Sequence, residues 1–300
     1  MTMLSRLGLG TVQFGQNYGV SNPRGRPDER EVAAILARAA AAGFGYLDTA
    51  PAYGDAEALV GRHLVRGHGL RIITKTPALT DVTIEARHKQ QVLNTLASSL
   101  DRLKVDAVHG LLVHQNGDLA KRGWQYLVDA LAEAKARGWT GWIGASIYND
   151  NQLNLVESRF RPEITQLPLD VHDRRSIVSG MLARLRSSGV EVHARSVFLQ
   201  GLLLMEPNRL PEFFAPVRQN IVDLHGLWRQ RGLSALDGCL AFALQRPEVD
   251  VVIVGVNCLD EFKQIEQAAA SSARVDGDID LDQPIDPVYV DPSQWPAFVE

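Results

Sequence analysis

Short apolar runs alternate with longer stretches of helical periodicity along the whole chain. Most of these runs are almost wholly apolar, which is typical of parallel strands that are covered on both faces. We therefore expect parallel strands that are separated by helices. The expected strands are residues 7–11, 46–48, 71–75, 107–113, 141–145, 163–167, 190–196 and 249–254.

The stretches between these runs carry the signals of helices. In the segment 83–103, valine and leucine recur at three- and four-residue spacing on one face. Gly43 and Gly138 follow two expected helix ends, and Asn149 or Asp150 is suited to cap the helix that begins there. The other helices are expected at 27–42, 56–66, 124–137, 175–187, 213–231, 234–245 and 259–270, with a long loop at 198–211.

Eight strand-helix units in about 270 residues predict a closed (β/α)8 barrel, the TIM barrel, with its active site at the C-terminal ends of the strands. A doubly wound open sheet is the alternative. Its usual Gly-x-Gly-x-x-Gly after the first strand is absent, because Gly8, Gly10 and Gly15 have the wrong spacing. We expect one domain over residues 1–300, ending in an irregular arm from about residue 275.

Bulk composition narrows the range of partners. Hydrophobic residues make up 45% and charged residues 22% of the 300, and the net charge is −4 without a long run of one sign. This balance predicts a soluble globular protein and argues against nucleic acid or an anionic membrane as the main partner. No run reaches the ~18 apolar residues of a membrane span, and no export segment is apparent, so we expect a cytoplasmic protein.

Cysteine and acidic residues give no sign of a metal site. Cys239 and Cys258 fit no metal-ligand spacing and are interpreted as small buried side chains in a reducing compartment. The acidic residues of the arm have no histidine near them, so a solvated face is expected, with Trp295 and Phe298 packing back on the body.

Four chemically versatile side chains stand at or just after the ends of consecutive strands. Asp48 ends the second strand, Tyr53 follows it by five residues, Lys75 ends the third, and His114 follows the fourth. If the strands are parallel, all four converge on one face. Taken singly, each has an ordinary structural explanation, such as a turn carboxylate or a surface amine. Their joint occurrence in this order favours a site that transfers a proton.

These residues carry a resemblance to the aldo-keto reductases that covers almost the whole chain. The matching pieces are segments 48–54, 74–75, 112–114 and 143–146. The resemblance implies an NAD(P)-dependent oxidoreductase that reduces an aldehyde or ketone, or oxidises an alcohol or sugar hemiacetal, by hydride transfer. The resemblance implies that Tyr53 is the general acid or base and that His114 polarises the carbonyl. Lys75 and Asp48 are then expected to adjust the pKa of the Tyr53 hydroxyl.

The same resemblance implies the contacts of the cofactor, with three departures. Ile147 stands where an asparagine is usual, Arg195 where an aromatic ring usually stacks on the nicotinamide, and Glu261 where NADPH-preferring members often carry arginine. We lean to NADP(H) on family habit and hold NAD(H) almost equal. The implied cofactor residues are Gly10, Thr11, Asp48, Ser146, Gln166, Arg195, Ser196, Phe198, Gln200, Gly201, Gly255, Asn257, Glu261 and Gln264.

The expected substrate pocket mixes amide and aromatic groups, which suits a small-molecule polyol or sugar-like carbonyl compound. The segments 146–148 and 195–203 also resemble bacterial members associated with sugar metabolism. A monomer or small homo-oligomer is expected. The residues assigned to the pocket are Phe14, Gln16, Asn17, Tyr18, Tyr53, His114 and Asn116, with parts of the 198–211 loop and the arm.

Two other functions remain open for this sequence. One is a non-catalytic NADPH-sensing subunit of the same fold, which would bind cofactor without turnover. The other is an aldolase that forms a Schiff base on Lys75, because barrels host such lysines.

Overall fold

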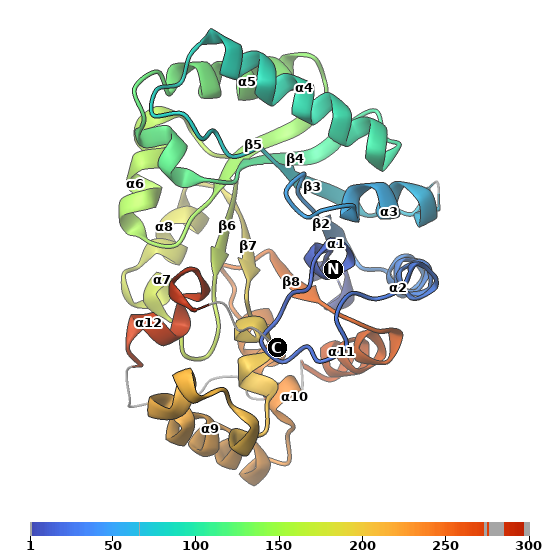
Figure 1. Cartoon of the computed structure of the whole chain (residues 1–300). Helices are drawn as coiled ribbons and strands as arrows, with labels where there is room; N and C mark the ends of the chain where they lie inside the picture. The colour runs from blue at the N-terminus through green and yellow to red at the C-terminus, as the bar shows by residue number, and fades with distance from the viewer. Residues whose placement is uncertain (1, 66, 273–274, 276–284, 297–300) are drawn as a thin grey trace.

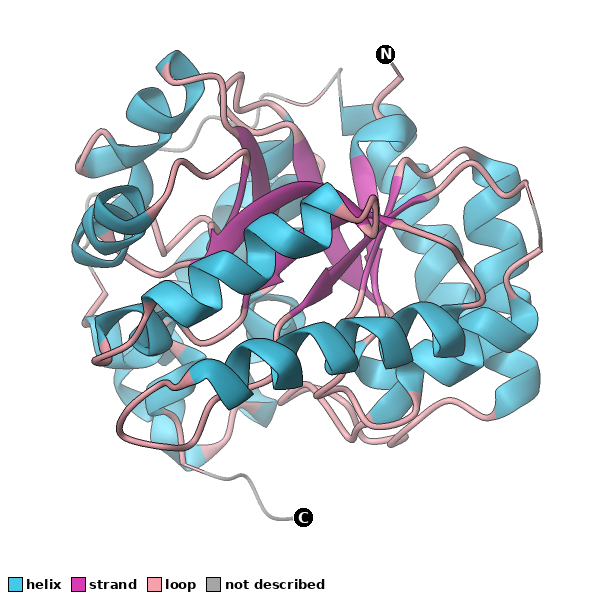
Figure 2. Cartoon of the chain, turned by 90° about the horizontal axis from the view of Figure 1, so that it is seen from above, coloured by secondary structure: helices cyan, strands magenta, loops and turns pink. Residues whose placement is uncertain are grey.

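The computed structural model describes residues 2–65, 67–272, 275 and 285–296. Within these residues, eight parallel strands close into a barrel in their order along the chain, and helices surround them (Figures 1 and 2). The strands are β1 (Leu7–Gly10), β2 (Tyr46–Asp48), β3 (Arg71–Lys75), β4 (Val108–Val113), β5 (Thr140–Ser146), β6 (Ile164–Pro168), β7 (Glu191–Arg195) and β8 (Val251–Gly255).

The first strand closes the sheet. Gly10 of β1 is in register with Asp48 of β2 on one side and with Gly255 of β8 on the other. The predicted barrel is therefore confirmed, and the open sheet is excluded. Because every strand is parallel to its neighbours, all eight C-terminal ends lie at one end of the barrel.

Helices follow the strands, and local signals set several of their limits. Asp28 accepts a hydrogen bond from the Glu31 amide, and Gly43 ends the same helix at φ 79°. No helix in the described part of the chain is long and apolar enough to cross a membrane. The helices are α1 (Val12–Gly15), α2 (Glu29–Ala42), α3 (Ala56–His63), α4 (Ala86–Leu103), α5 (Gln125–Ala136), α6 (Asp150–Arg159), α7 (Arg175–Val178), α8 (Met181–Ser187), α9 (Arg218–Gln230), α10 (Ala235–Leu244), α11 (Leu259–Ser271) and α12 (Pro287–Val290).

Three expected elements differ from the structure. The helix predicted at 175–187 is divided into α7 and α8 because Gly180 adopts a left-handed conformation with φ 78°. The helix predicted at 213–231 begins as a 3-10 helix, η5 (Glu212–Val217), which contains Pro216, and becomes α-helical only at α9. The predicted 198–211 loop contains 3-10 segments, η3 (Leu199–Leu204), which is interrupted by a kink at Gln200 and Gly201, and η4 (Pro207–Arg209).

The barrel has two apolar regions. A large cluster fills the space between the strands and the helices, and a smaller one that includes Ile73, Leu112 and Ile253 fills the barrel interior. Side chains of a strand alternate between these two sides. The residue two positions beyond an interior one therefore also faces inward, which turns Lys75 and Gly255 toward the C-terminal mouth of the barrel.

A polar cluster occupies the opposite end of the interior. The Glu191 carboxylate accepts a hydrogen bond from the Tyr46 hydroxyl at 3.0 Å and lies 3.2 and 2.8 Å from Nε2 of His109 and His193. Although burial raises the pKa of Glu191, the two imidazoles outweigh it and hold that pKa well below its usual value. The cluster lies at the N-terminal ends of the strands, where barrels carry structural rather than catalytic groups.

The described end of the arm packs back on the body, as predicted for Trp295. Its indole N–H donates to the Val288 carbonyl at 3.1 Å, and its ring centre lies 4.8 Å from that of Phe214. Phe298 and the acidic residues Asp276, Asp278, Asp280 and Asp282 lie outside the described residues.

Candidate active site

A buried ion pair joins the ends of two adjacent strands. The Lys75 ammonium lies 2.9 and 2.8 Å from the two carboxylate oxygens of Asp48 and donates to the Thr49 carbonyl at 2.9 Å. Lys75 is 2% exposed. These acceptors on β2 and the residue that follows it hold the ammonium in one place.

Tyr53 lies directly above this ammonium. Lys75 Nζ is 5.0 Å from the centre of the Tyr53 ring, and the Tyr53 and His114 rings meet edge to face at 5.9 Å. Burial opposes the charge of Lys75, but the Asp48 carboxylate and the Tyr53 hydroxyl outweigh it and raise the pKa of Lys75. The four residues singled out in the sequence are thus brought together around one point.

His114 is neutral at physiological pH. Burial and the nearby Lys75 charge lower the pKa of His114 to about 4. A neutral imidazole keeps one ring N–H for donation and does not compete with a phenol as proton donor. The positive charge beside Tyr53 is therefore that of Lys75.

Two glycines fix the loop that carries Tyr53. A Cβ added to Gly15 would lie 1.7 Å from the Tyr53 carbonyl oxygen, and one added to Gly54 would lie 2.5 Å from the Gly15 carbonyl oxygen. Gly54 also has φ 57°. Only glycine allows α1 and this loop to approach so closely. Sequence reasoning matched Gly54 to a family motif but missed Gly15, whose contact joins residues far apart in the chain.

A cavity of about 690 Å³ opens above these residues. Tyr53, His114 and Tyr18 line it, as do all fourteen residues predicted to contact a cofactor. Lys75 lies beneath the cavity lining. Sequence reasoning missed several lining residues, among them Gln13 and Tyr148, whereas Arg209 belongs to the 198–211 loop that was expected to contribute.

Three residues assigned to the substrate pocket do not line this cavity. Phe14 is fully buried in the main core because α1 turns its ring toward the body. Asn116 is 6% exposed, within the 3-10 helix η2 (Asn116–Ala120), and is absent from the cavity wall. Asn17 is also absent from the lining, whereas Gln16 contributes to it.

The cavity fits an elongated ligand with polar groups. Its volume lies within the range usual for cofactor sites. At its wall, Gln13 Oε1 and Asn257 Oδ1 are buried without a partner among the described residues, so both can accept from a ligand. A Cβ on Gly255 would lie 2.2 Å from the Gln13 amide nitrogen, so this part of the wall leaves no room for a larger side chain. A nicotinamide dinucleotide is compatible with these features.

Two carboxylates bind the turn that leads into α11, which contributes Asn257 and Glu261 to the cavity wall. Glu261 of α11 accepts a hydrogen bond from the Asn257 amide at 2.7 Å, and Glu31 of α2 accepts one from the Leu259 amide. These two amides belong to the turn that leads into α11. Lys263 follows Glu261 by two residues, but its ammonium lies 3.2 Å from the Asp260 carboxylate and is therefore paired with that group. Two carboxylates therefore occupy N–H groups that could otherwise bind an anion.

A strained segment covers the cavity after β7. Ser196, Leu199 and Gln200 have φ angles of 61°, 49° and 55°, in the left-handed region that side chains other than glycine disfavour. The Val20 amide donates to the Gln200 carbonyl at 3.1 Å and ties this segment to the loop after α1. Each such residue costs on the order of 1–3 kcal/mol and persists where its surroundings enforce it, often beside a ligand site.

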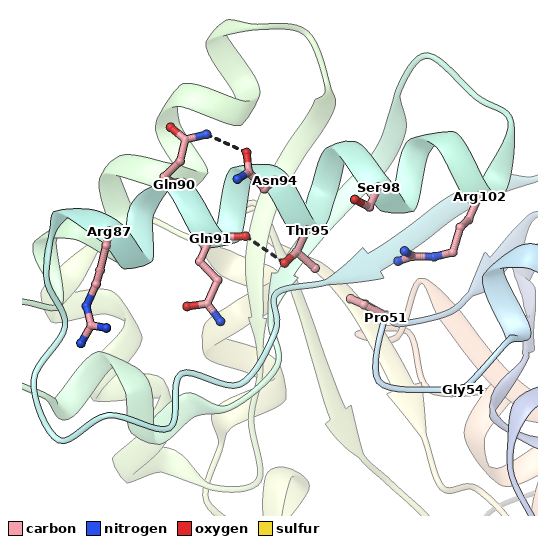
Figure 3. Close-up of a pocket in the computed structure, with 9 residues that line it drawn as sticks. All are labelled: Pro51, Gly54, Arg87, Gln90, Gln91, Asn94, Thr95, Ser98 and Arg102. Carbon is pink, nitrogen blue, oxygen red and sulfur yellow. Dashed lines mark hydrogen bonds between the residues drawn. The ribbon is translucent and has the colours of Figure 1, made fainter.

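A second hollow lies outside the barrel mouth. It has a volume of about 740 Å³ and runs between α4 and the loop after β2, where Gln91 and Arg102 extend on the side of Pro51 (Figure 3). Its polar groups bind one another, since Gln90 donates to Asn94 at 2.7 Å and Thr95 to the Gln91 carbonyl at 2.8 Å. It contains none of the four converging residues.

Known proteins resemble this chain over most of its length. A model of the aldo/keto reductase family matches residues 6–277. The uncharacterized oxidoreductase YqkF of Bacillus subtilis is 25% identical over 284 residues, which is 89% of this chain and 87% of that protein.

Solved structures share the fold. The putative aldo-keto reductase PA4992 of Pseudomonas aeruginosa superposes with a TM-score of 0.66 at 23% identity, over 90% of this chain and 91% of that one. The holo form of aldo-keto reductase AKR11C1 from Bacillus halodurans gives a TM-score of 0.68 at 22% identity, over 88% and 86% of the two chains.

Proposed function

The chain belongs to the aldo/keto reductase family, and on that premise we propose that Tyr53 is the general acid when its carbonyl substrate is reduced and the general base in the reverse direction. The observation that carries this proposal is the position of Lys75. Its ammonium is buried, bound to Asp48 and 5.0 Å from the centre of the Tyr53 ring. Members of the family use nicotinamide cofactors, so the enzyme is an NAD(P)H-dependent oxidoreductase.

Proton transfer is the part of the reaction assigned to the chain's own residues. A bound reduced nicotinamide supplies the hydride to the carbonyl carbon. The Tyr53 hydroxyl then donates its proton to the carbonyl oxygen as negative charge develops there. The Lys75 ammonium stabilises the phenolate that remains, and Asp48 keeps that ammonium charged although it is buried.

Three polar side chains orient the reactants. A ring N–H of neutral His114 donates to the carbonyl oxygen and polarises it. Ser146 and Gln166 are assigned to the carboxamide of the nicotinamide. They are neighbours in register on β5 and β6, and Gln166 Nε2 already donates to Asp48 Oδ1 at 2.8 Å. That bond fixes the orientation of the Gln166 amide before any ligand binds.

For the cofactor we propose NAD(H), although family habit favours NADP(H). Glu261, at the turn into α11, would lie beside the adenosine end of a bound dinucleotide, as the family resemblance implies. The Glu261 and Glu31 carboxylates there repel a 2′-phosphate, whereas a carboxylate accepts a hydrogen bond from a free ribose hydroxyl. Calorimetric titration with NADH and NADPH checks this choice, and tighter binding of NADPH contradicts it.

The proposed substrate is a small polyol or sugar-like carbonyl compound. Tyr18 and Tyr148 offer apolar faces with polar tips, and Gln16 adds an amide at the cavity wall. Such a lining suits a molecule with several hydroxyl groups better than a steroid. Turnover of hydrophobic ketones without turnover of sugar aldehydes or lactols would contradict this assignment.

A panel of aldehydes, ketones and sugars, assayed at 340 nm with NADH and NADPH in parallel, tests the proposal. Tyr53→Phe should bind cofactor as the wild type does and lose about 10²- to 10⁴-fold in kcat, the usual contribution of a positioned general acid. If the wild type binds cofactor but consumes none with any carbonyl compound, a sensing subunit is the better description. The raised pKa of Lys75 argues against the aldolase, since a Schiff-base lysine must be free of its proton.

A further inference from the structure

Arg195 directs a guanidinium into the mouth of the barrel. Alternate residues of a strand face the same side, so Glu191, His193 and Arg195 of β7 form one inward row from the N-terminal to the C-terminal end. The first two belong to the polar cluster at the far end of the interior. Arg195 is the member of this row that lines the cavity.

This guanidinium has no carboxylate partner among the described residues. Its central carbon lies over the ring of Tyr148, 4.4 Å from the ring centre, and the guanidinium donates to the Ser196 hydroxyl at 3.3 Å. A guanidinium has five N–H donors in a rigid fork. Most of them are available to a ligand, and the contact with the Tyr148 ring restrains the guanidinium in the cavity wall.

Arg195 faces the groups that are assigned to the carbonyl. Its positive charge contributes to lowering the pKa of His114 and acts against the rise that burial causes at Tyr18. Both side chains line the same cavity. His114 is neutral and Lys75 is paired with Asp48, whereas no carboxylate among the described residues offsets the charge of Arg195.

We propose that Arg195 binds an anionic group, a carboxylate or a phosphate, on the carbonyl substrate. This inference rests on the function proposed above and adds a charge to the substrate class. The planar fork suits the two oxygens of a carboxylate or phosphate in a bidentate contact. Carbonyl compounds that carry an acidic group, such as aldehydo acids or sugar phosphates, are then preferred to their neutral counterparts.

Matched substrate pairs test the preference in the wild-type enzyme. Succinic semialdehyde is compared with its methyl ester, and glyceraldehyde 3-phosphate with glyceraldehyde, at a fixed saturating cofactor concentration. We expect kcat/KM to be about 10- to 100-fold higher for the anionic member of at least one pair, as for a charge-assisted hydrogen bond. The pair with the larger ratio distinguishes carboxylate from phosphate. Ratios near 1 in both pairs overturn the inference.

Variants assign the preference to Arg195 itself. Arg195→Gln should bring the ratio of anionic to neutral kcat/KM close to 1, and Arg195→Lys should restore part of it, because the charge is kept and the fork is lost. Both members of a pair use the same cofactor, so any effect of the substitution on cofactor binding cancels in the ratio. Arg209→Gln removes a charge from the same cavity lining and serves as the matched control, with the wild-type ratio expected.

The outcomes separate this inference from the proposed function. If Arg195→Gln weakens cofactor binding but leaves the ratio as in the wild type, Arg195 serves the cofactor and the inference is wrong. The inference is also wrong if the ratio of anionic to neutral kcat/KM falls equally in Arg195→Gln and Arg209→Gln. The preference then comes from the overall positive charge of the cavity and not from a contact with Arg195. If no carbonyl compound, charged or neutral, is reduced, the proposed function itself fails.

Discussion

The buried pair of Asp48 and Lys75 is the feature on which the site depends most at the scale of single residues. Removal of one member leaves the other charged without its partner, which typically costs about 3–5 kcal/mol for a buried pair. We expect Asp48→Asn and Lys75→Met each to lower the free energy of unfolding by this amount in denaturant titrations. The double variant Asp48→Asn/Lys75→Met should recover most of the loss, and additive losses would contradict the pairing.

A second residue-scale prediction concerns a carboxyl group outside the active site. Asp170 is 1% exposed, and burial together with the nearby Asp173 charge raises the pKa of Asp170 to about 7. Its Oδ1 accepts from the His172 and Asp173 amides, both at 2.9 Å, while Oδ2 has no partner among the described residues.

Because this pKa is raised on folding, Asp170 favours the folded state most below the unfolded pKa of about 4, and that contribution is lost as the pH rises through 7. Asp170→Asn keeps the Oδ1 acceptor and cannot ionise. The variant should therefore gain stability over the wild type as the pH rises from 5 to 8, on the order of 3 kcal/mol. Thermal unfolding of both proteins at the two pH values checks this, and a difference independent of pH contradicts it.

The residues of the site were predictable where a strand fixes them. Asp48, Lys75 and His114 stand at strand ends, and parallel strands bring such ends together. Phe14 and Asn116 were not predictable, since each lies in a short helical turn whose direction depends on contacts with distant residues. The position of Arg195 against Tyr148 joins the end of β7 to the loop after β5 and likewise has no local signal in the sequence.

At the scale of elements, two glycines in adjacent helices should respond to alanine in opposite ways. A Cβ on Gly238 of α10 would lie 2.2 Å from the ring of Trp228 in α9, which is fully buried. A Cβ on Gly226 of α9 would meet nothing within 4 Å.

Gly238→Ala should therefore destabilise the protein by about 1–3 kcal/mol through overpacking. Gly226→Ala should stabilise it by up to about 1 kcal/mol, because alanine is the better helix former. Urea titrations of the two variants beside the wild type measure both effects. If the free energy of unfolding changes equally in the two variants, helix propensity and not the contact with Trp228 decides the outcome.

The order and kind of the main elements followed from apolar periodicity, and the exceptions have local causes. Gly180 divides one expected helix, and Pro216 keeps the start of another in a 3-10 conformation. The segment 199–209, expected as part of a loop, forms 3-10 helices. Their shape depends on the strained backbone at Gln200 and its contact with Val20, which joins distant parts of the chain.

At the scale of the whole molecule, closure of the barrel divides the interior into ends with different roles. The N-terminal end contains the Glu191 cluster and the C-terminal end contains the pair of Asp48 and Lys75, with an apolar layer between them. This layer separates the two sets of charges. At the C-terminal end, Tyr53 from the loop after β2 and His114 from the loop after β4 join Asp48 and Lys75.

Whether Lys75 acts through Tyr53 is the central question, and a double-mutant cycle answers it most directly. The rate of hydride transfer is measured at 340 nm under single-turnover conditions for the wild type, Tyr53→Phe, Lys75→Met and the double variant, each saturated with cofactor. We predict that Lys75→Met slows the wild type strongly but has almost no further effect once Tyr53 is phenylalanine. Losses that multiply in the double variant would contradict the account.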